Sequence, residues 1–471
     1  MDTKKLRQKI LDLAIRGKLV PQDPNDEPAS VLLERIKAEK EQLIKEGKIK
    51  RSKKSESTDK PHYENVPFEI PESWVWTTLG KISNYGQCEN VNVDDIDDGE
   101  WILELEDIEK DTGHVLQKLL KTDRKVCGTR HKFYPNEILY SKLRTYLNKV
   151  LVAPSPGFCT SEIIPINCFG VNPHYLCMVL RSNYYLDYTV SLGYGVKMPR
   201  LGTNDALISY IPIPPLCEQN RIVNEVAKWN KIIDNIESER SDLLAIVSQI
   251  KSKILDFAIS GKLIPQDPND EPAIELLKRI NPSFEPCDNS HYENIEFDIP
   301  ESWCWATIGD IFEHNTGKAL NASNPNGMLL DYITTSNLYW DRFELSVVKQ
   351  MPFTESEIER CVVTKGDLLV CEGGDVGRSA IWNYDYNIMI QNHIHRLRGK
   401  IDVCTRYFFY LFMYYKMCNL IGGKGVAIQG LSSRDLHNLI IPVPPLKEQH
   451  NIASSIDLYF SKLDTITAEI L

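Results

Sequence analysis

The chain carries the same three sequence blocks twice, in the same order, and this duplication limits its fold more than any other feature. The first block returns with 22 of 28 residues identical, so the chain is predicted to be a tandem repeat of one folding unit. The blocks are KILDLAIRGKLVPQDPNDEPASVLLERI at 9–36 and its copy at 253–280, HYENVPFEIPESWVW at 62–76 and its copy at 291–305, and IPIPPLCEQ at 211–219 and its copy at 441–449.

The stretch between the second and third blocks differs almost completely between the two halves, although its length agrees within one residue. This combination favours one scaffold with two different ligand-binding surfaces, because drift after duplication would erode the frame as well; drift remains the alternative. The first half has 15 extra residues between its first two blocks (offset 244 minus offset 229). They fall in the polar segment 37–60, which is predicted to be a helix tail and a solvated linker.

A heptad of apolar residues follows the third block and predicts a long helix with one seam facing a partner helix. Roughly 38 residues at about 1.5 Å each give a rod of about 55 Å. Arg240 alone interrupts the seam before the helix stops at Gly261. The predicted seam consists of Ile222, Val226, Trp229, Ile233, Ile236, Leu243, Val247, Ile250, Ile254 and Phe257.

The second copy repeats this seam, 230 residues later, up to the end of the chain at Leu471. By the repeat offsets, Leu471 corresponds to position 241 of the central helix and Met1 to position 245. We therefore expect the carboxy-terminal and amino-terminal helices to form a second rod together. The seam residues are Ile452, Ile456, Tyr459, Leu463, Ile466 and Ile470 at one end, and Leu6, Ile10 and Leu13 at the other.

Composition sets the remaining limits. A chain of 471 residues predicts two to four domains. Its net charge of −11 argues at first sight against DNA or an anionic membrane as a partner. The 12 cysteines form no CxxC pair, which favours reduced thiols in a cytoplasmic protein. The most apolar run, 407–415, is about half as long as a membrane span and is predicted to be a buried helix.

With these residues in view, the chain resembles the specificity subunit of type I restriction-modification systems. Two further phrases are similar to that family, NEILYSKLRTYLNKVLVA from Asn136 and GDLLVCEGGDVGRSAIW from Gly366. The strongest motif is a duplicated PPLxEQ ahead of a long helix, made of Pro214, Pro215, Leu216, Glu218 and Gln219 in one half and Pro444, Pro445, Leu446, Glu448 and Gln449 in the other.

The resemblance implies an α+β fold: two target-recognition domains, each mixed α/β with a twisted sheet, separated by long coiled-coil helices in a pseudo-twofold tandem repeat. The expected parts are an amino-terminal helical region at 1–50 that completes the second rod, target-recognition domains at 62–215 and 291–445, a central coiled-coil helix and turn at 216–280, and a carboxy-terminal coiled-coil helix at 446–471.

The same resemblance implies a non-catalytic, cytoplasmic subunit that reads a bipartite, asymmetric sequence in double-stranded DNA. Two methyltransferase subunits would dock on its helices and bind S-adenosylmethionine, so no cofactor is expected in this chain. Restriction subunits would join the full complex. A rod of fixed length would set the spacing of the two half-sites. Exposed rod residues such as Lys228, Asn230 and Lys231 are candidates for methyltransferase contact.

A basic segment, 121–149, is the candidate DNA surface of the first domain, with eight cationic and two acidic residues. Alternation in ILYSKLRTYLNKV predicts a strand that places Lys142 and Arg144 on one face with Tyr140 and Tyr146. Such a strip would supply phosphate contacts and, through arginine, guanine recognition; a solvated strand edge is the alternative. The candidates are Lys121, Arg124, Lys125, Arg130, Lys142, Arg144, Tyr146, Asn148 and Lys149.

The second domain has no comparable run, because Glu372 and Gly374 stand where Lys142 and Arg144 would be. Its polar residues instead predict a strand with one polar face around 391–396. Gln and Asn suit adenine and Arg suits guanine. The candidates are Arg378, Gln391, Asn392, His393, His395 and Arg396.

A glycine-containing segment closes each domain, from Gly193 and from Gly422, and glycine permits close approach of the backbone to DNA. Helix capping is the competing explanation for the polar residues there. The candidates are Lys197, Arg200, Asn204, Lys424, Gln429 and Arg434.

Other functions find less support in the sequence. It contains no Walker loop, NPPY-like tetrapeptide, PD…ExK pattern or HExxH, so catalysis by this chain alone is not expected. A metal at His393 and His395, or calcium in the acidic segment 94–98, is poorly supported by the spacing. Aromatic residues would also fit carbohydrate binding. A recognition subunit whose partner fuses nuclease and methyltransferase stays open as an alternative.

Overall fold

The computed structural model describes residues 2–47, 49, 66–192, 198–287, 298–320, 327–421 and 431–470. The chain divides into two compact units, Met1–Glu239 and Arg240–Leu471, and the long helix α7 (Leu216–Ile259) contributes to both. We call 66–215 the first head and 298–445 the second head. The candidates Lys197, Lys424 and Gln429 lie outside the described residues.

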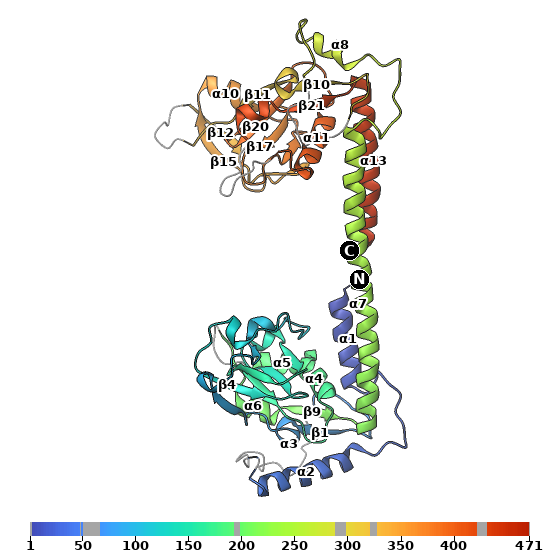
Figure 1. The fold of residues 1–471 in the computed structure, drawn as a ribbon, viewed down its shortest axis with the longest axis vertical. Helices are drawn as coiled ribbons and strands as arrows, with labels where there is room; N and C mark the ends of the chain where they lie inside the picture. The colour runs from blue at the N-terminus through green and yellow to red at the C-terminus, as the bar shows by residue number, and fades with distance from the viewer. Residues whose placement is uncertain are drawn as a thin grey trace. The chain divides into compact units, whose positions relative to one another are not determined.

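The first unit holds three small sheets with helices packed around them (Figure 1). Its sheets have the strand orders β1-β9, β2-β4-β7-β3 and β6-β5-β8. Its elements are α1 (Thr3–Ile15), α2 (Ala29–Lys45), β1 (Val75–Thr78), α3 (Leu79–Ile82), β2 (Glu89–Asn92), β3 (Ile102–Leu103), β4 (Thr129–Phe133), β5 (Ile138–Ser141), β6 (Val150–Val152), β7 (Gly157–Thr160), β8 (Ile163–Ile166), α4 (Pro173–Arg181), α5 (Asn183–Ser191), α6 (Thr203–Ile208), β9 (Tyr210–Ile213) and α7.

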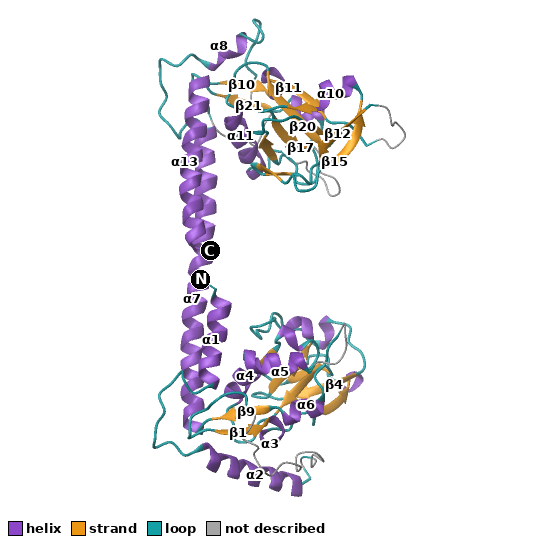
Figure 2. Cartoon of the chain, turned by 180° about the vertical axis from the view of Figure 1, so that it is seen from behind, coloured by secondary structure: helices purple, strands orange, loops and turns teal. Residues whose placement is uncertain are grey.

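The second unit repeats this plan with more strands and one additional two-stranded sheet (Figure 2). Their strand orders are β10-β21, β11-β20-β17-β18, β15-β12-β19-β16 and β13-β14. Its elements after α7 are α8 (Ala273–Lys278), β10 (Cys304–Thr307), α9 (Ile308–Ile311), β11 (Phe312–Thr316), β12 (Met328–Ile333), β13 (Leu338–Tyr339), β14 (Arg342–Phe343), β15 (Lys349–Phe353), α10 (Glu355–Cys361), β16 (Val362–Val363), β17 (Leu368–Cys371), β18 (Ser379–Ile381), β19 (Ile388–Ile390), β20 (Ile394–Gly399), α11 (Thr405–Met417), α12 (Ser433–His437), β21 (Ile440–Val443) and α13 (Leu446–Ile470).

The three duplicated blocks meet in space, in a cluster that we call the hub. In the first unit Glu218, buried at the start of α7, accepts hydrogen bonds from Trp74 Nε1 at 2.9 Å and from Gln22 Nε2 at 2.5 Å. The second unit repeats the arrangement at Glu448, which accepts from Trp303 at 2.9 Å and Gln266 at 2.6 Å. A buried carboxylate needs such partners, so each block depends on the other two.

The glutamine of the PPLxEQ motif ties the hub to the head. Gln219 donates to the carbonyl of Pro214 at 3.0 Å and accepts from the backbone N–H of Asn172, the residue that caps α4, at 2.8 Å. Gln449 does the same with Pro444 and with the N–H of Cys404 ahead of α11. The copied residues therefore orient each head on its helix, which explains why the blocks persist while the heads diverge.

The rod helices pair within each unit, but four of the ten predicted seam residues of α7 are wrong. Ile222, Val226, Ile233 and Val247 are buried, as expected. The intervening seam positions hold polar residues that bond across the helix pair: Arg7 of α1 reaches Asn230, Asp234 and Glu237, and Lys251 pairs with Asp464 of α13. Four residues assigned to the seam, Trp229, Leu243, Ile250 and Phe257, are exposed instead.

The error arises because the predicted and the observed seam of α7 have residues in common, among them Ile222, Val226, Ile233 and Val247, and differ in the positions between them. A helix heptad can turn to either side of the shared residues, and ion pairs across the rod select the side with Asn230, Glu237 and Lys251. The predicted association of the amino- and carboxy-terminal helices in one second rod stays a prediction.

The apolar run 407–415 forms the middle of α11, where eight side chains of the helix are buried, so the predicted core helix is confirmed. Around it, the rings of Phe312 and Phe408 meet edge to face with centroids 4.9 Å apart. In the described part of the chain, no helix is long and apolar enough to cross a membrane.

Candidate nucleic-acid interface

Three chain segments that are remote in sequence meet at the end of β5 in the first head. The backbone N–H of Lys142 donates to the carbonyl of Glu162 at 3.0 Å, and the N–H of Leu201 donates to the carbonyl of Lys142 at 2.9 Å. The N–H of Arg144 also bonds the carbonyl of Pro199, at 2.8 Å. This junction brings together two groups of predicted DNA contacts, those after residue 141 and those before residue 205.

The second head has the same junction at the end of β17. The N–H of Glu372 donates to the carbonyl of His393 at 3.0 Å, and the N–H of Leu431 donates to the carbonyl of Glu372 at 2.8 Å. Strand register supports the equivalence, because Tyr140 pairs with Ile164 in β5–β8 and Val370 pairs with His395 in β17–β20. The two heads thus share a backbone frame at the place where their candidate residues gather.

The side chains on this shared frame differ in charge. In the first head Arg200 makes a bidentate ion pair with Glu162 at 3.0–3.3 Å, and Lys142 stands beside them half-exposed. In the second head Glu372 faces His393 at 3.3 Å. The first copy therefore carries an ion pair and a further lysine, whereas the second carries a carboxylate that faces a histidine.

The predicted strand through Lys142 and Arg144 is wrong. Strand β5 ends at Ser141, and a single 3-10 turn over Thr145–Leu147 follows. Two left-handed residues, Arg144 (φ 51°) and Asn148 (φ 50°), flank this turn and reverse the chain. Alternation failed as a guide because left-handed residues without glycine leave no signal in the pattern.

The turn changes which side chains are presented. Tyr140 is buried, whereas Tyr146 stands 47% exposed at the tip. Asn148 is buried and donates to the carbonyl of Arg181 at 3.0 Å, so it fixes the turn and is not available to DNA in this conformation.

A pocket of about 280 Å³ opens beside the turn. Lys149 donates from its wall to the carbonyl of Leu105 at 2.7 Å, and burial lowers the pKa of this lysine. The Nε of Arg144 is buried and has no hydrogen-bond partner among the described residues. The lining residues are Leu105, Glu106, Ser141, Leu143, Arg144, Leu147 and Lys149.

Several predicted contacts in the first head have structural partners instead. Arg124 pairs at 2.8 Å with Asp107, a fully buried carboxylate, and Arg130, itself buried, pairs with Glu104 at 2.8 Å. Lys121 donates to the carbonyl of Ile96 at 2.5 Å. These cations neutralise the acidic residues of their own head, which sequence spacing could not reveal because the partners lie 17 to 26 residues away.

The predicted polar face at 391–396 is also wrong in the second head, because β20 begins only at Ile394 and both polar residues that follow are buried. His395 Nε2 lies 2.8 Å from the carbonyl of Leu431, and its Nδ1 lies 2.9 Å from Nε2 of His314. Burial and the neighbouring His395 lower the pKa of His314 to about 4. Arg396 bonds Glu313 and the carbonyl of Val362, each at 2.7 Å.

The remaining candidates stay accessible. Arg378 stacks on the ring of Tyr339 and donates to the carbonyl of Thr335 at 2.7 Å. The exposed Arg342 stacks on the same ring, and sequence reasoning missed it. The two arginines share Tyr339 only in the folded chain, because they lie 36 residues apart in the sequence. The exposed or half-exposed candidates are Lys125, Lys142, Arg144, Tyr146, Arg200, Asn204, Arg378, Gln391, Asn392, His393 and Arg434.

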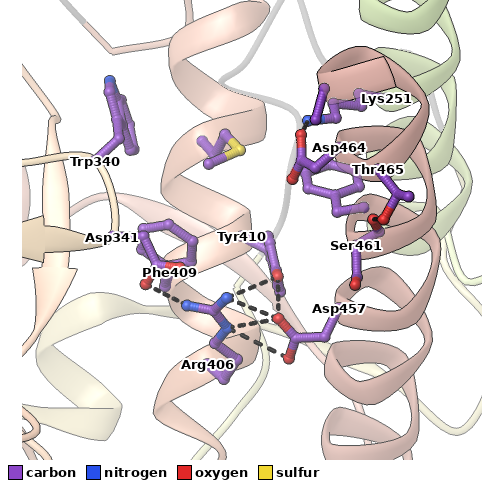
Figure 3. Close-up of a pocket in the computed structure, with 13 residues that line it drawn as sticks. Lys251, Trp340, Asp341, Arg406, Phe409, Tyr410, Asp457, Ser461, Asp464 and Thr465 are labelled. Carbon is purple, nitrogen blue, oxygen red and sulfur yellow. Dashed lines mark hydrogen bonds and ion pairs between the residues drawn. The ribbon is translucent and has the colours of Figure 1, made fainter.

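A larger cavity, about 730 Å³, lies in the second unit between α11, α13 and α7 (Figure 3). Arg406 of α11 crosses it and pairs with Asp457 of α13 at 2.7 Å and with Asp341. Tyr410 donates to the same Asp457 at 2.5 Å. These groups satisfy one another and brace the head against its helix, so the cavity presents no free nucleophile–base pair among its described lining residues.

The described residues contain no group of three or more His, Cys, Asp or Glu side chains that could hold a metal ion. His393 and His395 point to different partners, since one faces Glu372 and the other the carbonyl of Leu431.

Comparisons with known proteins agree with this geometry. A family model described as the type I restriction modification DNA specificity domain matches residues 300–471. The specificity subunit of the type I restriction enzyme EcoAI from Escherichia coli is 28% identical over 96% of this chain and 88% of its own length. The corresponding EcoEI subunit from Escherichia coli is 27% identical, over 99% and 90%.

Solved structures share the fold. A chain from a study of complex assembly and conformational transition of the type I R-M system has a TM-score of 0.61 at 17% identity, covering 86% of this chain and 94% of that one. The HsdS subunit from Thermoanaerobacter tengcongensis has a TM-score of 0.51 at 18% identity, covering 86% and 95%. The mixed helix-and-sheet fold with a long linking helix is confirmed. Residues 300–471 thus match the type I restriction modification DNA specificity domain, and nearly the whole chain is similar to specificity subunits of type I restriction enzymes.

Proposed function

We propose that the chain reads a bipartite, asymmetric DNA target with its two heads. The observation that carries this proposal is the junction: one backbone frame, present twice, with Lys142 and Arg200 on the first copy and Glu372 and His393 on the second. Two readers with the same frame and different side chains would each select their own half-site. Identical heads would instead favour a palindrome.

The net charge of −11 is compatible with this role. Several acidic residues are paired within the heads, such as Asp107, Glu104 and Asp367, whereas Lys142 and Arg144 stand half-exposed near the junction of the first head. Phosphate attraction by the isolated chain would then be weak, and partner subunits that encircle the DNA would supply much of it.

We further propose that the rods carry two methyltransferase subunits, which bind S-adenosylmethionine, and that restriction subunits join the same complex. Support comes from an apolar stripe along α7 outside the seam, with two residues spaced by three in the first unit and four residues spaced by three, four and seven in the second. Its six large residues are 40% to 48% exposed, and exposed stripes of this kind mark protein interfaces. We call these six residues the rod stripe: Trp229, Ile232, Leu243, Ile246, Ile250 and Phe257. Leu458, Tyr459 and Ile466 of α13 are exposed as well.

The reading function is tested by co-expressing the chain with its proposed methyltransferase partner in a host that lacks this modification. Sequencing that detects methylated bases should show one split, asymmetric motif with a constant spacer. Purified chain alone, incubated with DNA and S-adenosylmethionine, should transfer no methyl groups. Methylation by the chain alone, or a palindromic motif, would contradict the proposal.

The docking surface is tested by charge substitution on the rod stripe. Trp229→Glu and Ile246→Glu should each weaken co-purification of the methyltransferase subunit at least tenfold while leaving the chain folded. Ser238→Glu, exposed on the same helix outside the stripe, is the matched control and should bind normally. Equal binding by all three variants would place the partner elsewhere.

A further inference from the structure

Arg144 has a left-handed backbone conformation, which is energetically unfavourable for any residue with a Cβ atom. Its φ is 51°, and the residue at the equivalent place of the second head, 230 positions later, is Gly374 with φ 74°. Both follow the junction residue, Lys142 or Glu372, by two positions. The frame therefore demands a left-handed residue at this point, and only the second head meets the demand with glycine.

Space does not explain the choice of glycine in the second head. A Cβ built on Gly374 meets no atom within 4 Å, so a side chain would fit there and only the backbone conformation disfavours it. The first head keeps a large charged side chain at the same costly position. Strain that the surroundings retain is typical of binding sites.

The surroundings of Arg144 point to a ligand with acceptor atoms. Its guanidinium lines the 280 Å³ pocket with Ser141 and Lys149, and its Nε is buried without a described partner. Lys149 is already engaged with the carbonyl of Leu105. The donor without a described partner at this wall, Nε, thus belongs to a planar guanidinium, whose fork matches the O6 and N7 acceptors of guanine.

We propose that Arg144 is a specificity-determining residue of the first head and that it recognises guanine in that head's half-site. The inference rests on the proposed reading function. A base edge is favoured over a phosphate because phosphates are the same in both half-sites, so a phosphate clamp would serve both heads. A guanidinium in one head, with glycine at the equivalent position of the other, would let the two heads select different bases.

The experiment compares four full-length chains, each in complex with the methyltransferase subunit: wild type, Arg144→Gly, Arg144→Lys and Asn136→Gly. Asn136 is the matched control, since it is also left-handed (φ 67°) and exposed in the first head but lies in the β4–β5 turn. Each complex selects from a DNA library randomised over the first half-site, and thermal melting of each chain is recorded.

The wild type should select guanine at one position, and Arg144→Gly should lower that preference at least tenfold without lowering the melting temperature. Arg144→Lys keeps the charge but not the fork, so it should lose the same preference. Asn136→Gly should select as the wild type does.

Each other outcome overturns a defined statement. Wild-type complexes that select no split motif would refute the reading function itself. A wild type that selects a split motif, with Arg144→Gly losing affinity equally for all sequences and with a shallower salt dependence, would make Arg144 a phosphate contact and refute the inference alone. Unchanged selection by Arg144→Gly would refute it as well.

Discussion

The two heads satisfy the same structural demands with different chemistry. Where the first head pairs Tyr140 with Ile164 and Leu139 with Pro165, the second pairs Val370 with His395 and Leu369 with Arg396. The sheet of the first head is thus apolar at these positions, whereas the sheet of the second head contains the hydrogen-bonded pair His314–His395 and the buried Arg396. Both versions deliver the chain to the same junction, so the internal support of a reading surface can change while its frame is kept.

The hub, by contrast, is the same in both units to within about 0.1 Å in the bonds around Glu218 and Glu448. The comparison teaches that duplication preserved what positions the heads and released what they present. The following predictions test that division, first on the shared hub and then on the parts that differ.

The largest expected effect is equal damage in the two hubs. Glu218→Ala and Glu448→Ala each leave a buried tryptophan N–H without its acceptor and remove one of the two acceptors of a glutamine amide, which should lower the local stability of the affected unit by about 3 kcal/mol. Hydrogen exchange followed by mass spectrometry, read on β1–β9 and β10–β21, measures it. Glu→Gln at either position keeps an acceptor and should cost less. Damage in only one unit would show that the hubs are not equivalent.

The next effect separates the heads by pH. The folded pKa of His314 is about 4, below its ordinary value of 6.5, because of burial and the neighbouring His395, His437 and Arg396. The His314–His395 pair therefore contributes stability above about pH 6.5, and this stability is lost as the pH falls toward 4. We expect a loss on the order of 1 kcal/mol, discounted for partial exposure. Tyr85 holds the equivalent place in the first head.

Amide exchange across β11 and β20 between pH 7 and pH 4.5 measures this loss. His314→Gln retains a donor for His395 but does not titrate, so it should flatten the pH dependence of these strands. The exposed His174 of the first head is the control, and His174→Gln should leave the profile of β11 and β20 unchanged. A profile that His314→Gln does not alter would assign the acid sensitivity to other groups.

The shared frame was predictable from sequence because it is written twice. Repetition identified the blocks, the tandem fold and the helix pairs, and long identical stretches such as PQDPNDEP mark residues that depend on one another. The seam was only partly predicted, because α7 also carries apolar residues outside it. Ion pairs of Arg7 and Lys251 lie across the helix pair, and the apolar pattern gave no sign of them.

The candidate sites were harder to predict because charge in sequence does not tell which cations are free. Arg124, Arg130 and Arg396 carry the same charge as Arg144, but each has a carboxylate partner within its own head: Asp107, Glu104 and Glu313. The left-handed turn at 144–148 was invisible since neither flanking residue is glycine. Its glycine counterpart in the second head was the available signal.

A smaller effect of opposite sign is expected at that position of the two heads. Arg144→Gly relieves the left-handed arginine and should stabilise the first unit by about 1 kcal/mol, whereas Gly374→Ala introduces the same strain and should destabilise the second by about 1 kcal/mol. Urea unfolding followed by exchange in each head measures both. If both substitutions destabilise, Arg144 makes stabilising contacts that outweigh its backbone strain.

The smallest effect concerns one carbonyl that the two heads cap differently. The carbonyl of Gly80, in the first half of α3, accepts from Lys40 of α2, which also donates to the carbonyl of Ser83 at 3.1 Å. The equivalent carbonyl of Gly309 accepts from Lys400 at 2.6 Å. Burial lowers the pKa of Lys40 to about 8. The folded first head therefore binds fewer protons than the unfolded chain between about pH 8 and 10.5, and its stability rises with pH there.

Methionine at either lysine position separates the two caps. Lys40→Met should cost the first head about 1 kcal/mol at pH 7 and abolish the rise in its stability above pH 8, because the buried amine is its source. Lys400→Met removes an exposed side chain and should cost the second head about 0.5 kcal/mol without changing its pH dependence. Amide exchange in α3 and α9 at pH 7 and pH 9.5 reports both. If the rise in the first head persists in Lys40→Met, then Lys40 is not its source, and α2 is held against that head by its buried apolar residues alone.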